Sequence, residues 1–217
     1  MIQLYSPTKT MVVAAVALLS GLLTLSAPAD ERGRFEPKPA GTYAARQTNE
    51  NITIGVEPYQ NAEKLKLAFG KVDFARLGVL PVLVVVANDT DHAIQLDRMR
   101  AQLITADRQN IEPISAEDAL RPGRVKAPPV NRQRLPIPGI GRGSKGPKDE
   151  GQLSAREFVA PAAVAHSEVS GFFYFRMGKG PDRIPGSKLY ITGIRDARTG
   201  QEVFYFEIGL DAYAKAR

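Results

Sequence analysis

Residues 79–87 read Val-Leu-Pro-Val-Leu-Val-Val-Val-Ala, and this stretch decides the fold class of the chain. It is a nearly continuous apolar run that is rich in β-branched residues. Such a run is typical of a strand that is buried on both faces of a sheet. Pro81 cannot donate a backbone hydrogen bond, so we expect it near the start of the strand, where the ladder requires no donor.

Shorter segments before and after this run favour further strands, most of them because apolar residues alternate with polar ones. These segments are residues 51–57, 93–96, 101–105, 111–114, 169–177, 189–194 and 201–210. In the last of them, Phe204, Phe206 and Ile208 are expected to face one way, with Val203, Tyr205 and Glu207 facing the other. About seven strands with turn residues at short intervals predict an all-β protein, an antiparallel sandwich.

Turn residues predict how two pairs of these strands are joined. Asn88 to Asp91 should close a hairpin between the 79–87 and 93–96 strands. Asp196 to Gly200 should close another near the end of the chain, with Gly200 suited to a positive φ angle.

One or two short helices are expected between the strands. Residues 61–69 place apolar side chains on one helical face, and Gly70 is a suitable stop. Ser115 to Asp118 has the spacing of a capping box, which predicts a single helical turn.

The first residues predict export. Lys9 supplies a positive charge, residues 11–25 are an uncharged apolar run, and Ala27-Pro28-Ala29 fits a signal peptidase site. A signal peptide over 1–29 would place the mature protein, from Asp30, in the periplasm or outside the cell. The alternative is an uncleaved membrane anchor, but the run is shorter than the roughly 20 residues that cross a bilayer.

The chain contains no cysteine, which excludes several classes of site. Disulfides, thiolate nucleophiles, zinc–thiolate centres and a lipid anchor on cysteine are all ruled out. Hydrophobic residues make up 43% of the chain, so a hydrophobic core must stabilise the exported domain.

The mature chain is predicted to be one domain with two irregular parts. A flexible lead-in is expected over 30–48, and the sandwich domain over 49–213. A Pro- and Gly-rich loop is expected to interrupt the domain over 121–150, because the periodicity stops there.

The excess of positive charge in the chain, whose formal net charge is +6, is concentrated in this loop. The basic segment, residues 121–148, has eight Lys or Arg and no Asp or Glu, so the rest of the mature chain is slightly acidic. The eight candidate contacts with an anionic surface are Arg121, Arg124, Lys126, Arg132, Arg134, Arg142, Lys145 and Lys148. Like charges so close together extend a segment and attract anionic polymers, lipid head groups or acidic proteins. The alternative is a solvated insertion without a partner.

Three motifs carry a resemblance to a known family. They are Pro81-Val82-x-Val84-x-Val86-x-Asn88-x-Thr90-Asp91, Ser170-Gly171-Phe172-x-Tyr174-Phe175 and Asp196-x-x-Thr199-Gly200. Over residues 50–115 and 155–210 the chain resembles the immunoglobulin-like domains of bacterial exported proteins. The resemblance implies an immunoglobulin-like sandwich and supplies no catalytic residue. The chain departs from the lipoprotein members of that family, because it lacks their cysteine and has the basic segment.

Motifs for catalysis or cofactor binding are weak. Residues 139–146 contain a Gly-x-Gly cluster, but a Pro-rich stretch precedes it and Pro147 follows, where a phosphate site needs a strand and a helix. The chain has no Gly-x-Ser-x-Gly nucleophile elbow. Nucleic acid is not expected as a partner, because the protein is predicted to be exported and no aromatic residues are interleaved with the cations for base stacking.

One metal hypothesis remains. His92 lies in the predicted hairpin turn with Asp89 and Asp91, and Met99 and His166 are the other candidate donors. A site would need three or four converging donors.

These observations predict an exported binding or structural protein of the cell envelope, not an enzyme, without cofactor or small-molecule substrate. The expected partner is an envelope protein or an anionic surface polymer. The alternative is an envelope enzyme or metal-handling factor centred on the His92 turn.

Overall fold

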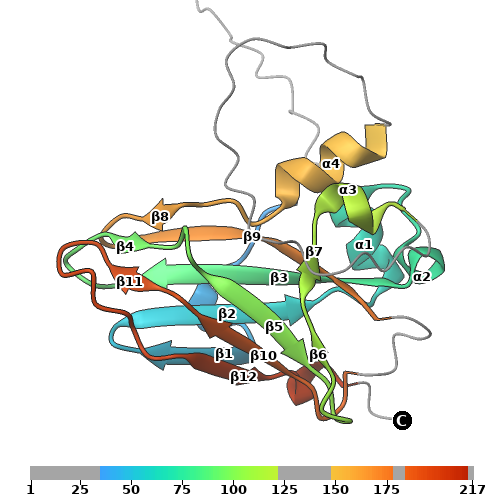
Figure 1. Ribbon diagram of the computed structural model, residues 1–217. Coiled ribbons are helices and arrows are strands. Elements are labelled where there is room, and N and C mark those ends of the chain that lie inside the picture. Colours follow the sequence, from blue (N-terminus) through green and yellow to red (C-terminus); the bar gives the residue numbers. More distant parts are fainter. Residues whose placement is uncertain (1–34, 122–147, 178–183, 215–217) are drawn as a thin grey trace, which may run out of the picture. The chain divides into compact units, whose positions relative to one another are not determined.

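The computed structural model describes residues 35–121, 148–177 and 184–214 (Figure 1). The predicted signal peptide and residues 122–147 of the basic segment lie outside these ranges. Within them are twelve strands in three sheets and a few short helices, which confirms an all-β fold with more strands than expected. No helix in these ranges is both long and apolar enough to cross a membrane.

The largest sheet has five antiparallel strands in the order β1–β2–β3–β9–β7. Their bounds are β1 Ala45–Asn49, β2 Ile52–Pro58, β3 Val79–Asn88, β9 Ser167–Arg176 and β7 Pro113–Ile114. All ten residues of β3 are buried, as the apolar run predicts. The strand pairs with β2 on one edge and with β9 along its whole length on the other.

Two smaller sheets complete the strand arrangement. The four-stranded sheet contains β12 Phe206–Gly209, β10 Lys188–Thr192, β5 Arg100–Ile104 and β6 Asn110–Ile111, in that order. The three-stranded sheet contains β11 Arg195–Asp196, β4 Ile94–Gln95 and β8 Ala162–Ala163. Pairing of β10 with β12 confirms the C-terminal hairpin, and Gly200 has the expected positive φ of 72°.

The hairpin predicted between β3 and residues 93–96 is wrong. Residues 94–95 do form a strand, β4, but it pairs with β8 and β11. Both edges of β3 are already occupied, since Asn88 lies opposite Ile52 on one side and Ser167 on the other. The chain therefore leaves the large sheet after Asn88.

Two hydrophobic cores lie on opposite faces of the five-stranded sheet. One contains Val82, Val84 and Val86 of β3 with residues of β5, β10 and β12, so it fills the space between the two larger sheets. The other contains Leu83 and Val85 with residues of the helices. This alternation explains why β3 has no polar face.

The helices cover the second face of the five-stranded sheet (Figure 1). They are α1 Ala62–Phe69, α2 Phe74–Leu77, α3 Ala116–Ala119 and α4 Lys148–Arg156, and two 3-10 turns cover Ala40–Thr42 and Asp211–Tyr213. The cap predicted at Ser115 is present, since its side chain accepts from the Asp118 N–H. Asn61, which was expected inside the first helix, instead caps α1 by accepting from the Glu63 N–H. Gly70 ends α1 with a φ of 67°. The sequence did not predict α2 or α4.

The lead-in expected over 30–48 is wrong at its C-terminal end, because residues 45–48 belong to β1. Glu50 and Asn51 both have positive φ angles, as a two-residue hairpin turn between β1 and β2 requires. The side chains of Gln47 and Asn49 bond to the backbone of β12 and the residue before it, at the N–H of Glu207 and the carbonyl of Tyr205. These polar residues thus close one side of the sandwich, where sheet edges would otherwise be open.

Candidate functional site

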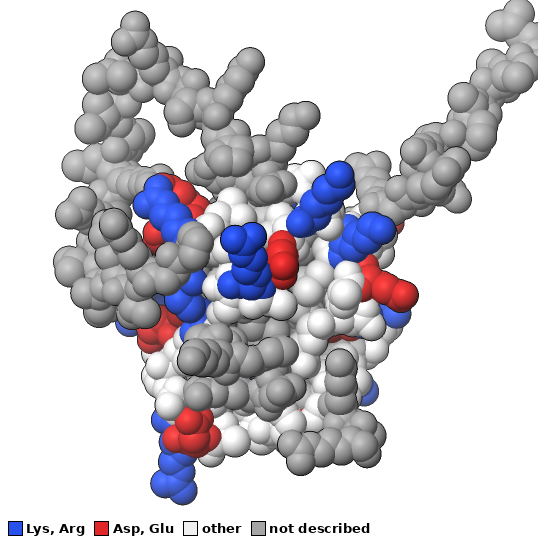
Figure 2. All heavy atoms as spheres, turned by 90° about the vertical axis from the view of Figure 1, so that its right-hand side faces the viewer, with Lys and Arg blue, Asp and Glu red and all other residues white. Residues whose placement is uncertain are grey.

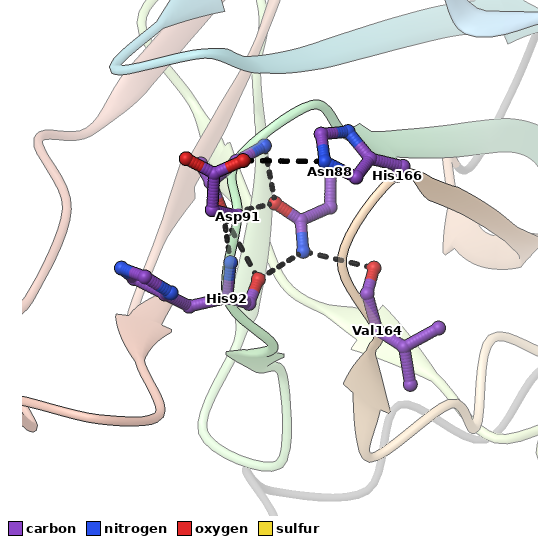
Figure 3. A network of polar contacts seen from close by, with 6 residues as sticks. Asn88, Asp91, His92, Val164 and His166 are labelled. Carbon is purple, nitrogen blue, oxygen red and sulfur yellow. Dashed lines mark hydrogen bonds and ion pairs between the residues drawn. The ribbon is translucent and has the colours of Figure 1, made fainter.

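After Asn88 the chain crosses from the five-stranded sheet to β4, and the Asn88 side chain ties this crossover to the segment around Ala163 (Figure 3). It is fully buried, and its Nδ2 donates to the carbonyl oxygens of His92, Ala163 and Val164 at 2.7, 3.2 and 2.9 Å. Its Oδ1 accepts from the backbone N–H and the hydroxyl of Thr90 at 3.2 and 2.7 Å. The amide is therefore satisfied within the protein, which indicates a structural role for this motif.

The candidate metal donors meet only in part. His166 Nε2 lies 3.3 Å from Asp91 Oδ1, and both side chains are mostly exposed. Met99 lies elsewhere, on an apolar groove that Phe158 and Phe173 also line. Across residues 35–121, 148–177 and 184–214, no group of three or more His, Cys, Asp or Glu side chains is placed to hold a metal ion.

Two of the eight predicted anion contacts lie in the described part of the chain. The guanidinium of Arg121 pairs with Glu117 in α3, and its carbonyl accepts from Arg176 at 3.0 Å. Arg121 therefore belongs to the folded domain and already has an acidic partner. Lys148 is the first residue of α4, so the loop predicted to run to about residue 150 ends earlier. The other six contacts are outside the described residues: Arg124, Lys126, Arg132, Arg134, Arg142 and Lys145.

Both described ends of the basic segment are anchored to the five-stranded sheet. At the first end, Arg176 of β9 donates to the carbonyls of Leu77, Asp118 and Arg121. At the second end, Leu153 of α4 is fully buried, and its backbone carbonyl accepts a hydrogen bond from the Tyr174 hydroxyl at 2.9 Å. Burial raises the pKa of the Tyr174 phenol above its ordinary range, so the ring stays neutral and donates.

The helical layer around these ends carries charges of both signs (Figure 2). Its exposed cations include Lys66, Lys71 and Arg76, next to acidic residues such as Glu63 and Asp73. Mixed charges of this kind produce a weak net field. The basic segment, which has cations only, therefore differs from the surface from which it emerges.

One exposed feature was not predicted from the sequence. Phe204 and Tyr205 are 73% and 52% exposed, although the expected strand pattern placed Phe204 on the same face as the buried Phe206. With Gln47, Asn49 and Glu50 these two aromatic residues line an open groove of about 340 Å³. We refer to these five residues as the aromatic groove.

Comparison of the chain with protein families, with curated proteins and with solved structures finds no match.

Proposed function

We propose that this chain is an exported immunoglobulin-like sandwich that acts in the cell envelope by binding, with the basic segment attracting anionic surfaces. The observation that carries the proposal is the distribution of charge. Eight cations stand within residues 121–148 without one acid, while the rest of the mature chain has a small excess of acids.

The anchoring of the segment supports this proposal. The segment begins just after α3 and ends at the first residue of α4. Both helices pack on the five-stranded sheet. The residues that flank positions 122–147, Arg121 and Lys148, therefore both lie in this helical layer. Each Lys or Arg near an anionic surface contributes about 1 kcal/mol at most, so a few contacts would give weak but measurable binding.

One of the eight cations, Arg121, has an acidic partner in the described part of the chain. Arg121 is already paired with Glu117, which leaves seven cations of the segment as candidates for the anionic partner. Acidic envelope polysaccharides and anionic lipid surfaces both present the required charge.

The test is co-sedimentation of the mature protein with phosphatidylglycerol vesicles, and its retention on polygalacturonate. We expect binding at low salt that is lost by a few hundred millimolar, because the Debye length is about 10 Å at 0.1 M salt and shorter above it. A variant with Gln at Arg124, Lys126, Arg132, Arg134, Arg142, Lys145 and Lys148 should lose binding and keep its fold.

A matched control changes cations of the helical layer. Replacing Lys66, Lys71 and Arg76 with Gln also removes positive charge but leaves the basic segment intact. We expect this variant to bind like the wild type. Equal binding by the seven-Gln variant and the wild type would show that the segment is a spacer.

A further inference from the structure

The exposure of Phe204 and Tyr205 follows from how the chain enters β12. Val203 and Phe206 are both buried, and the Val203 N–H donates to the Ile194 carbonyl at 2.8 Å. Two inward-facing residues three positions apart do not fit the two-residue period of a strand. The chain between them is irregular, and its two aromatic residues stand outside the core.

The Tyr205 side of the groove is held by well-defined neighbours. The Asn49 side chain donates to the Tyr205 carbonyl at 3.0 Å, and the Gln47 side chain accepts from the Glu207 N–H at 2.7 Å. The Tyr205 ring also lies 5.3 Å from that of Tyr190 on the outer face of the four-stranded sheet. A binding surface fixed in this way loses little entropy when it is occupied.

The lining of the groove restricts the ligand. It combines two aromatic rings, two amides and one carboxylate, and includes no Lys or Arg. An anionic ligand would therefore be repelled by Glu50 and would find no counter-charge in the lining. The groove is open, has a volume of about 340 Å³ and is lined by five residues, whereas a stable protein interface involves about 20–30 residues on each partner.

The amides add hydrogen-bonding capacity. Gln47 Nε2 donates to Asn49 Oδ1 at 3.5 Å, and Asn49 Nδ2 donates to the Tyr205 carbonyl. Each amide nitrogen carries two protons, so a second donor on each can serve a ligand hydroxyl. The Glu50 carboxylate accepts hydrogen bonds and cannot donate them.

We propose that the aromatic groove binds a neutral sugar ring of a glycan. The apolar C–H face of a pyranose stacks on an aromatic ring, while its hydroxyls bond to amides and carboxylates at the edge. This inference is independent of the proposed binding of anionic surfaces, because the groove and the basic segment share no residue.

The test uses the mature protein and three neutral probes: cellohexaose, maltohexaose and chitohexaose. Titrations up to about 10 mM, followed by amide chemical shifts and calorimetry, cover the millimolar affinities expected of a shallow site. At least one probe should shift the signals of Phe204 and Tyr205. Phe204→Ala and Tyr205→Ala should each weaken its binding about tenfold, and Tyr205→Phe, which keeps the ring, should stay within about threefold.

The matched control is Leu67→Ala in α1, which removes another exposed apolar side chain, one that is 51% exposed. It should leave sugar binding unchanged, as should the seven-Gln variant of the basic segment. Failure of all three probes to bind, or equal affinity of wild type and Phe204→Ala, would refute the proposal. So would a dimer that Phe204→Ala dissociates, because a second copy would then be the occupant.

Discussion

The backbone of Phe158 occupies the space that a side chain of Gly171 would need. A Cβ atom built on Gly171 would lie 2.4 Å from Phe158 Cα and 2.7 Å from its nitrogen. This approach allows the Phe158 N–H to donate to the Phe172 carbonyl at 3.0 Å and its ring to stack on Phe173. The segment after α4 is thereby fixed against β9.

Gly171→Ala should consequently destabilise the domain by about 2–4 kcal/mol, because the obstructing atoms belong to the backbone and cannot rotate away. Urea unfolding of the protein from Asp30 onward measures the change. The control is Gly209→Ala in β12, where no atom lies within 4 Å of the added Cβ. That variant should unfold within about 0.5 kcal/mol of the wild type, and equal stability of both variants would contradict the packing argument.

Two replacements of Asn88 should separate the contribution of its amide N–H groups to stability from that of its shape. Asn88→Ala leaves three carbonyls and the Thr90 hydroxyl without this partner, at an expected cost of about 2–4 kcal/mol. Asn88→Asp has nearly the same shape but sets an acceptor against carbonyl oxygens, so it should cost more than alanine at pH 7. Urea midpoints of the two variants give the order.

The exposed pair next to this network provides the control. Asp91→Asn removes the charge that faces His166, but both side chains are largely in solvent. Exposed ion pairs contribute about 0–1 kcal/mol, so we expect a small change. An Asp91→Asn effect as large as that of Asn88→Ala would mean that the exposed pair also supports the crossover.

The sequence predicted the individual strands of this fold better than it predicted which strands pair with each other. The apolar run of β3 identified a doubly buried strand because both of its faces meet a core. The same reasoning correctly predicted a strand at β4 but paired it with the wrong strand. Local alternation carries no information about which sheet edge is free. β4 cannot pair with β3 because β2 and β9 already occupy both edges of β3.

The aromatic groove and β1 were missed for related reasons. β1 is largely polar, so apolar alternation could not detect it. Its Gln47 and Asn49 side chains form hydrogen bonds with the backbone at Glu207 and Tyr205, in and just before β12. In residues 203–206 the alternation breaks, because Val203 and Phe206 are both buried although they are three positions apart. Four consecutive hydrophobic residues were the available signal, and strand periodicity cannot show which of them leave the core.

Glu157 should make stability depend on pH. Burial raises the pKa of its carboxyl, against a smaller lowering effect of the hydrogen bond from the Ala116 N–H. The folded state then binds the proton more tightly than the unfolded state, so stability falls as the pH rises through the raised folded pKa. Glu157→Gln should increase Tm by about 1–2 °C at pH 7 and give no gain at acidic pH, below the unfolded pKa. Thermal unfolding across that pH range tests the sign, and a gain that is independent of pH would rule out this cause.

Removal of the basic segment should leave the domain folded, provided that its anchored ends are kept. A deletion of residues 122–147, bridged by a short Gly/Ser linker, retains Arg121 with its bonds to Glu117 and Arg176. Loop-closure entropy varies only with the logarithm of loop length, so Tm should stay within about 3 °C of the wild type. Thermal unfolding followed by circular dichroism measures the difference.

A longer deletion supplies the contrast that makes this test decisive. Removing residues 122–153 takes away Leu153, which is fully buried and whose carbonyl accepts from the Tyr174 hydroxyl. Loss of this side chain leaves a cavity and an unpaired phenol, together costing about 3–5 kcal/mol. We therefore expect a large drop in Tm for the longer deletion and almost none for the shorter one. A comparable drop in both would show that residues 122–147 pack on the sandwich, and the basic segment would then be part of the folded domain.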